Sequence, residues 1–344
     1  MCYRVLDFSF IGVISEARRQ GFKERQVQAR RLGEEVQVLA PAKLNLFFEI
    51  LAKRPDGFHE IVTLMAPLDI YDTIVVRDVS PSDNQYPAGS VVLEGAWAAG
   101  LRAPQFSPVA AESSGSFGVE ELPQGTDNIA VRAIGLLRER AGIDRSAAVR
   151  LTKRIPSAAG LGGGSSDAAA ALVAANVAWS LNWSRERLAG LAAELGSDVP
   201  FFLYSAPAVC RGRGEQIEPV RRFGKLHVVV VRPPAGLSTA AVYRACRPSV
   251  APLAVEPLLE ALWRGDARQL GRRMHNALAA AARGLSPWID RLAGEFAGME
   301  CLGSQMSGSG SSYFGICRNA GHAQAVVRRL RARRLGRVFT AACG

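Results

Sequence analysis

The sequence predicts an α+β fold, organised as two domains or as one large domain. Strand-like and helix-like segments alternate irregularly along the 344 residues, which is typical of α+β proteins and not of a doubly wound parallel sheet. Hydrophobic residues make up 48% of the chain, enough for substantial cores at this length. The most informative stretch is glycine-rich, residues 156–167, and it lies between a strand-like segment and an alanine-rich segment.

Residues 1–35 are interpreted as a loosely ordered N-terminal extension. Their apolar stretch, 5–14, is interrupted by Asp7 and has no small-residue cleavage site after it, so a secretory signal is not expected. Ordered structure is expected from Val36 onward. Alternation of apolar and polar residues predicts strands at 36–40, 41–51, 61–68, 73–79 and 91–94.

The second of these strands carries a polar face. Lys43, Asn45 and Phe47 are expected on one face, while Leu44, Leu46 and Phe48 are expected on the other. Farther along, residues 80–124 are rich in Pro, Gly, Ser and Ala, and 98–118 is the expected mobile insertion.

Helices follow from 3.6-residue spacing and from capping residues. One is expected at 128–137, capped by Thr126 or Asp127, and another at 184–195, capped by Ser184. The remaining predicted helices are 238–243, 255–264, 266–281, 287–297 and 321–335. Strands are expected around Val209, at 225–232, and after a second glycine-serine loop at 304–315.

The stretch 156–166 has the features of a phosphate-binding loop. Its glycines have no Cβ, so backbone N–H groups can approach a ligand, and Ser165, Ser166 or Asp167 can cap the helix that follows. A helix N-terminus attracts anions. The alternative is a flexible turn. The predicted phosphate-binding residues are Pro156, Ser157, Ala158, Ala159, Gly160, Leu161, Gly162, Gly163, Gly164, Ser165 and Ser166.

Two common phosphate loops are excluded by their missing residues. A Walker loop needs a lysine before the serine, where this chain has Gly164. A dinucleotide-binding fold needs an acid about 20 residues after the glycines, and residues 181–184 contain none. Catalytic groups must therefore come from elsewhere. Lys43, in an apolar strand, and Asp198, in a turn beside Pro200, are the candidates for stabilising phosphate charge and accepting a proton.

The formal net charge of +11 is compatible with nucleic acid, an anionic membrane or acidic small substrates as partners. Much of the excess lies at 328–337, which is interpreted as the solvated face of a helix. This segment has no interleaved aromatic residues, so no nucleic-acid partner is expected. No apolar run reaches the roughly 18 residues of a transmembrane helix, and six scattered cysteines fit a reducing cytoplasm.

Several motifs resemble those of the GHMP kinases. Residues 156–167 are similar to the glycine-rich motif of this superfamily, and 304–315 are similar to its C-terminal glycine motif. Residues 41–46, 54–59, 160–169 and 196–202 resemble the 4-diphosphocytidyl-2-C-methyl-D-erythritol kinases, one family within it. The resemblance implies a ribosomal protein S5 domain 2-like N-terminal domain at 36–210 and a ferredoxin-like C-terminal domain at 211–344.

The resemblance also implies roles for single residues. Asp198 matches the catalytic base, Lys43 the lysine beside it, and Asn45 a residue near the transferred phosphate. His59 matches the histidine at the cytosine edge. Phe58 and Tyr243 match two aromatics that sandwich the cytosine, although Phe58 stands where the family usually has tyrosine.

The implied activity is ATP-dependent phosphorylation of the 2-hydroxyl of 4-diphosphocytidyl-2-C-methyl-D-erythritol (CDP-methylerythritol), in the non-mevalonate isoprenoid pathway. Mg²⁺ is expected to arrive with ATP, with no dedicated metal site, no membrane partner, and a monomer or homodimer as the assembly. The alternatives are another GHMP kinase, for mevalonate or homoserine, and a catalytically inactive nucleotide-binding regulator.

Overall fold

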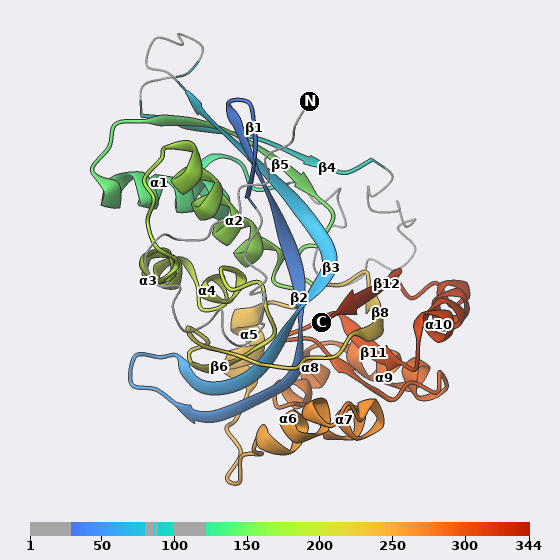
Figure 1. Cartoon of the computed structure of the whole chain (residues 1–344). Coiled ribbons are helices and arrows are strands. Elements are labelled where there is room, and N and C mark those ends of the chain that lie inside the picture. Colours follow the sequence, from blue (N-terminus) through green and yellow to red (C-terminus); the bar gives the residue numbers. More distant parts are fainter. Residues whose placement is uncertain (1–28, 80–85, 87–88, 100–121) are drawn as a thin grey trace.

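The structure is a computed structural model that describes residues 29–79, 86, 89–99 and 122–344, and it confirms the α+β class (Figure 1). Its strands form one mixed sheet with the central order β1-β2-β3-β12-β8-β11-β10. The strands are β1 (Ala29–Leu32), β2 (Glu35–Lys53), β3 (His59–Val79), β4 (Val91–Trp97), β5 (Ser146–Lys153), β6 (Ala208–Gly212), β7 (Gln216–Pro219), β8 (Leu226–Arg232), β9 (His275–Asn276), β10 (Gly303–Met306), β11 (Tyr313–Cys317) and β12 (Arg337–Cys343).

The helices alternate with these strands. They are α1 (Ile129–Ala141), α2 (Gly163–Ala178), α3 (Arg185–Leu195), α4 (Val199–Phe202), α5 (Thr239–Ala245), α6 (Glu256–Trp263), α7 (Ala267–Arg273), α8 (Ala279–Leu285), α9 (Pro287–Ala297) and α10 (Ala320–Ala332), with a 3-10 turn at Gly125–Asp127. No helix among the described residues is long and apolar enough to cross a membrane.

Strands β2 and β3 form a long antiparallel pair that runs through the molecule (Figure 1). Strand β2 joins the predicted strands 36–40 and 41–51, because Pro41 marks a register shift and not a strand end. Strand β3 likewise joins the predicted strands 61–68 and 73–79. A second shift between Asn45 and Phe47 breaks the alternation. Phe47 therefore packs in the same hydrophobic cluster as Leu44 and Leu46, and its predicted place beside Lys43 was wrong.

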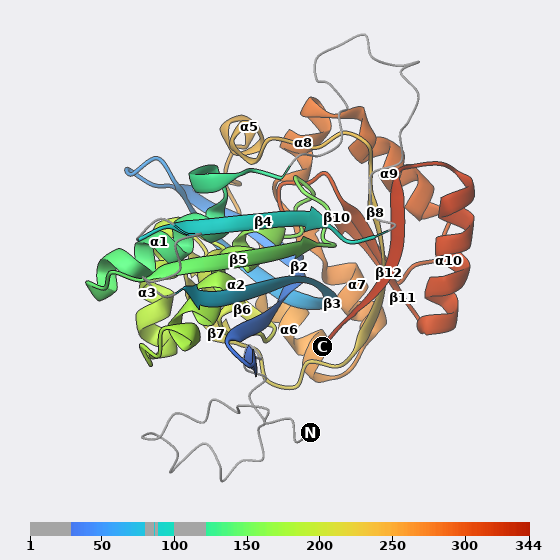
Figure 2. The same cartoon turned by 90° about the horizontal axis from the view of Figure 1, so that it is seen from above.

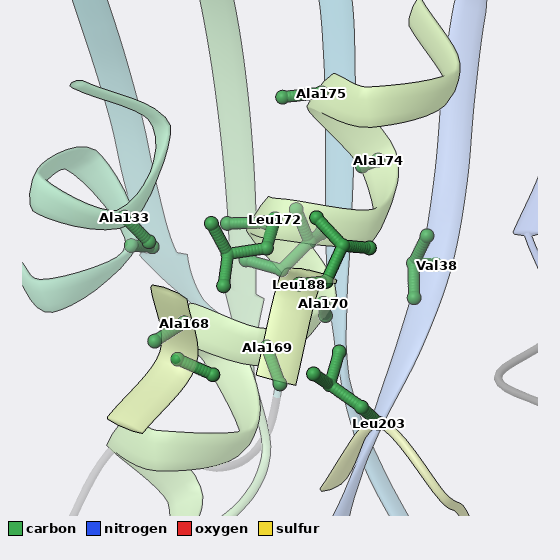
Figure 3. Close-up of a cluster of buried hydrophobic side chains, with 14 of the residues drawn as sticks. Val38, Ala133, Ala168, Ala169, Ala170, Leu172, Ala174, Ala175, Leu188 and Leu203 are labelled. Carbon is green, nitrogen blue, oxygen red and sulfur yellow. The ribbon is translucent and has the colours of Figure 1, made fainter. Parts of the chain in front are cut away.

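One half of the sheet is covered by α1–α4, as Figures 1 and 2 show. The alanine-rich helix α2 is buried on almost every side, since alanine lets neighbouring strands and helices approach closely. Figure 3 shows its alanines packed with Val38 of β2, Leu188 of α3 and Leu203 after α4.

In the other half, β8 and β11 have a helical layer on each face. Val228, Val230 and Ile316 pack in one cluster with α6 and α7, while the alternating Val229 and Val231 pack in another with α8–α10 (Figure 2). The pairing of Cys343 in β12 with Leu68 in β3 joins the two halves into one sheet.

Several element predictions differ from the structure. The part of the predicted N-terminal extension from Ala29 forms β1 and the start of β2, while residues 1–28 and most of the 98–118 insertion lie outside the described residues. Asn128, and not Thr126 or Asp127, caps α1, because those two residues belong to the 3-10 turn before it. The predicted boundary at residue 210 falls within β6.

The predicted helix 266–281 is instead α7, the short strand β9 and α8. Its middle is extended because His275 and Asn276 pair with Phe47 and Phe48 of β2. The Ser184 cap of α3 is confirmed by its bond from the Arg187 N–H, and Ser238 caps α5 in the same way.

Candidate active site

The two glycine loops, far apart in sequence, lie against each other. The Ser307 hydroxyl donates to the Gly160 carbonyl at 3.0 Å, and the Ser312 N–H donates to the Ala159 carbonyl at 3.2 Å. A Cβ on Gly160 would overlap the Ser307 carbonyl oxygen and lie 2.9 Å from that of Gly310. Only a residue without a side chain permits this approach.

Helix α2 begins inside the first glycine loop, earlier than predicted. Gly162, with φ of +70°, occupies the capping position without any side-chain hydrogen bond. The expected cap by Ser165, Ser166 or Asp167 was therefore wrong, because all three residues lie within the first turns of the helix. The buried Ser166 hydroxyl has no hydrogen-bond partner. The N–H groups at the start of α2 and the glycines without Cβ fit the phosphates of a nucleotide.

The predicted pair of Lys43 and Asp198 meets beside this loop. Lys43 Nζ lies 3.5 Å from Asp198 Oδ2 and donates to Asn45 Oδ1 at 2.6 Å. A Cβ on Gly162 would lie 3.0 Å from Lys43 Cγ, which places the lysine directly under the loop. The lysine side chain is 4% exposed and that of Asp198 is 35% exposed, so the carboxylate can reach an incoming hydroxyl.

A buried network fixes the orientation of Asn45. Its Nδ2 donates to the Thr63 hydroxyl at 2.9 Å, and Thr63 in turn donates to the Phe47 carbonyl at 2.7 Å. The amide oxygen of Asn45 consequently faces Lys43. Gln305 donates to the Asn45 carbonyl at 2.8 Å, so the strand before the second loop holds the backbone at this point.

Sequence reasoning missed these supporting residues. Thr63 and Gln305 belong to other strands, and their contacts depend on tertiary pairing. Asn276, in the middle of the mispredicted helix, donates to the carbonyls of Met306 and Gly308 and holds the second loop. An asparagine in a helix interior is unfavourable, and this was the one local signal.

Of the three predicted base-binding residues, His59 and Tyr243 lie together. The His59 and Tyr243 rings are 5.3 Å apart between centroids and inclined by 41°. Burial, and after it the charge of Asp198, raise the pKa of Tyr243, so this ring lies within electrostatic range of the predicted base. Burial also lowers the pKa of His59, which keeps the imidazole neutral near pH 7. Phe58 is 48% exposed and is covered by the Arg213 guanidinium, whose carbon is 4.7 Å from the ring centroid.

A charged cluster that the sequence did not predict lies beneath the glycine loop. Lys153 Nζ contacts Asp72 and lies 2.6 Å from Asp167 Oδ2, and all three residues are buried. Asp72 also accepts from the N–H groups of Arg154 and Ile155, whereas Asp167 Oδ1 has no partner. Asp72 is thus the better stabilised carboxylate, and burial raises the pKa of Asp167 to about 8.

This cluster makes stability depend on pH. Between about pH 4 and pH 8 the folded chain keeps a proton on Asp167 that the unfolded chain releases, so stability falls as pH rises. We expect the Asp167→Asn variant to lack this loss of stability. From pH 5 to pH 8, its free energy of unfolding should therefore rise relative to that of the wild type by roughly 1–3 kcal/mol. Denaturant unfolding at both pH values measures it, with the exposed Asp56→Asn as control. Parallel profiles for the wild type and the Asp167→Asn variant would contradict it.

Metal binding has limited support from side chains. Within the described ranges, no group of three or more His, Cys, Asp or Glu residues is placed to hold a metal ion. The buried side-chain oxygen atoms near the glycine loop belong to the Ser166 hydroxyl and to the carboxylates of Asp72 and Asp167, which are each paired with Lys153.

Comparisons with known proteins point to one superfamily. Residues 128–206 match the model of the GHMP kinases N-terminal domain, and 258–334 match that of the GHMP kinases C-terminal domain. A 4-diphosphocytidyl-2-C-methyl-D-erythritol kinase of Pelotomaculum thermopropionicum is 37% identical over 298 residues, covering 86% of this chain and 94% of that protein.

Comparison with solved structures points to the same superfamily. A crystal structure of 4-(cytidine 5'-diphospho)-2C-methyl-D-erythritol kinase has a TM-score of 0.68 and 35% identity, covering 90% of this chain and 99% of that one. A homoserine kinase from Cytophaga hutchinsonii also has a TM-score of 0.68, covering 92% of this chain and 96% of that one. Its identity is 19%, so this likeness concerns the fold alone.

Proposed function

Because the chain belongs to the GHMP kinases and, among them, to the 4-diphosphocytidyl-2-C-methyl-D-erythritol kinases, we propose that it phosphorylates the 2-hydroxyl of CDP-methylerythritol with ATP. This reaction belongs to the non-mevalonate route to isoprenoid precursors. The observation that carries the proposal is the meeting of the glycine loop with the Lys43–Asp198 pair. The two-domain GHMP fold is the one expected from the motifs, while the boundary at residue 210 stays a prediction.

ATP is the phosphate donor of this superfamily. We place its phosphates on residues 156–166, where Gly160 and Gly162 carry no side chain and the loop leads into the N-terminus of α2. Mg²⁺ would be held by the phosphate oxygens of ATP, since the described residues provide no acidic cluster for it. When bound, it would neutralise charge on the transferred phosphoryl group.

Asp198 is proposed as the general base. Its partly exposed carboxylate would accept the proton of the attacking hydroxyl, and Lys43 would offset the negative charge that develops between the hydroxyl and the phosphate. Asn45 holds the Lys43 ammonium by accepting a hydrogen bond from it. Positioning and electrostatic stabilisation of this kind account for most catalysis of phosphoryl transfer.

The cytosine base of the acceptor would bind at some distance from the transferred phosphate. We assign the cytosine base to Phe58, His59 and Tyr243, with the neutral His59 hydrogen-bonding the edge of the base. Stacking of one base on an aromatic side chain is worth about 1–3 kcal/mol, which makes these rings the main source of selectivity. The 5.3 Å separation of the His59 and Tyr243 rings supports a common subsite.

The alternatives are supported less well. The likeness to homoserine kinase extends to the fold alone at 19% identity, whereas the relatives that share 35–37% identity with this chain are kinases of the cytidine compound. An inactive regulator would not need Lys43 and Asp198 at 3.5 Å beside an unobstructed loop. Assembly as a monomer or homodimer and a cytoplasmic location stay predictions.

The proposal is tested by a substrate panel. The purified protein is given ATP and Mg²⁺ with CDP-methylerythritol, mevalonate or homoserine, and ADP release is followed. We expect turnover with the cytidine compound and less than about 1% of that kcat/KM with the other two alcohols, because neither can use the aromatic subsite. Turnover of mevalonate or homoserine alone would overturn the assignment, and no turnover of any alcohol would favour the regulator.

A further inference from the structure

The buried cluster of Asp72, Lys153 and Asp167 has no part in the proposed reaction, yet it lies directly beneath the glycine loop. A Cβ on Gly163, the first residue of α2, would lie 3.3 Å from Lys153 Nζ. At the start of the loop, Asp72 accepts a hydrogen bond from the Ile155 N–H at 2.8 Å. Asp167 directly follows the last residue of the loop and contacts the same lysine. The cluster therefore braces both ends of the loop.

The charges of this cluster do not balance. One ammonium group contacts two carboxylates, so the cluster carries one net negative charge when both carboxylates are ionised. The side chains of Asp72, Lys153 and Asp167 are 0%, 6% and 5% exposed, so water and salt screen this charge only weakly. A single proton bound to one of the carboxylates makes the cluster neutral.

The hydrogen bonds identify Asp167 as the carboxylate that binds this proton. Asp72 accepts two backbone N–H bonds in addition to its contact with Lys153, whereas Asp167 Oδ1 accepts none. The two carboxylates also lie within hydrogen-bonding reach of each other, so a protonated Asp167 can donate to Asp72. Burial raises the pKa of Asp167 to about 8, and the charge of Asp72 acts in the same direction.

The other elements that pack against α2 bring few charges to this point. The buried side chains of α1, α3 and α4 are apolar. Lys43 of β2 also lies beneath the loop but is paired with Asp198. Arg31 of β1 bonds the Val177 carbonyl near the other end of α2, and the Arg154 guanidinium is bonded to two other residues of β3. The charge state of the cluster is therefore set mainly by its own three members.

On the premise that the loop binds ATP, as proposed above, we infer that ATP binding is coupled to the uptake of one proton by the Asp72–Lys153–Asp167 cluster. The proton comes from solvent and forms an O–H bond on the Asp167 carboxylate, and no other bond changes. The phosphates bring negative charge close to a cluster that is either neutral or negative, and they bind better to the neutral form.

The sign of the pH dependence follows from this linkage. ATP raises the affinity of the cluster for the proton by the same factor by which the proton raises the affinity for ATP. The affinity for ATP is therefore greatest below about pH 8, where Asp167 is protonated, and it falls as the pH rises and the cluster becomes negative. Phosphate groups, with a second pKa of about 6, stay ionised over this range and do not contribute.

The test is isothermal titration calorimetry of ATP with Mg²⁺ and without acceptor, in two buffers of different ionisation enthalpy. For the wild type at pH 8, we expect uptake of about 0.3–0.5 proton per ATP, and a Kd about 3- to 10-fold weaker at pH 9 than at pH 7. Asp167→Asn and Asp72→Asn should each abolish the uptake, because either leaves one carboxylate for one ammonium. Their Kd should change by less than about twofold over the same range.

The matched control is Asp78→Asn, six residues after Asp72 in the same strand, where the carboxylate pairs with Arg145 at the surface. This variant should take up protons like the wild type. Binding of ATP by the wild type without proton uptake would overturn the inference, and so would uptake that persists in both cluster variants. If the wild type bound no ATP at any of these pH values, the proposed function itself would be wrong and the coupling would fall with it.

Discussion

Asp198→Asn is expected to lower kcat by about 10²- to 10⁴-fold while KM for both substrates changes by less than about fivefold. Asparagine keeps the shape of the side chain but cannot accept the hydroxyl proton. The substitution also removes the negative charge 3.5 Å from Lys43 Nζ, so the ammonium keeps only its bond to Asn45. Substrate binding should survive, because the base subsite and the glycine loop do not depend on this carboxylate. Steady-state ADP release at saturating ATP and acceptor measures the effect.

The matched control for this substitution is Asp290→Asn. Asp290 is an exposed aspartate that pairs with Arg283 on the surface, and its loss should leave kcat within about twofold. A second readout is the pH profile, since a residual rate in the Asp198→Asn variant that depends on hydroxide should increase with pH. Retention of near-wild-type kcat by the Asp198→Asn variant would show that another group takes the proton.

The local chemistry of the site could be predicted from sequence, and its assembly could not. Glycines without a Cβ at a helix start indicate an anion site wherever they occur, and a lysine in an apolar strand requires a partner. Neither argument says which partner. Lys43 and Asp198 are far apart in the sequence, and they meet because α4, which follows Asp198, packs beside α2 under β2.

The errors arose where tertiary contacts outweigh local preference. The alternation expected along β2 failed at Phe47 because a register shift between Asn45 and Phe47, which the residue pattern does not reveal, interrupts it. In the sequence, Asp72 and Lys153 look like ordinary strand residues, because nothing local shows that they are buried together with Asp167. Arg213 lies in a turn whose glycines suggest only a hairpin, and its place on Phe58 depends on pairing of β6 with β3.

Gly160→Ala is expected to reduce kcat/KM for ATP by at least about 100-fold, since misplacement of a binding loop by about 1 Å can cost that much. The new methyl group would overlap the backbone carbonyl of Ser307 and approach that of Gly310 to 2.9 Å. Neither neighbour is a flexible side-chain end, so the two loops must separate. The backbone at Gly160, with φ of +70°, is in addition unfavourable for alanine. Initial rates over a range of ATP concentrations, together with the thermal midpoint, measure both consequences.

The control is Gly135→Ala in α1, where nothing lies within 4 Å of the added methyl and φ is not positive. That change should leave kcat/KM unaltered and raise stability slightly, by about 0.5–1 kcal/mol.

Because Gly308 of the second loop also approaches Lys43 and Asn45, separation of the loops should weaken the catalytic pair as well as ATP binding. We therefore expect kcat of the Gly160→Ala variant to fall at saturating ATP. If saturating ATP restored wild-type kcat, the second loop would serve nucleotide binding alone and would not support Lys43.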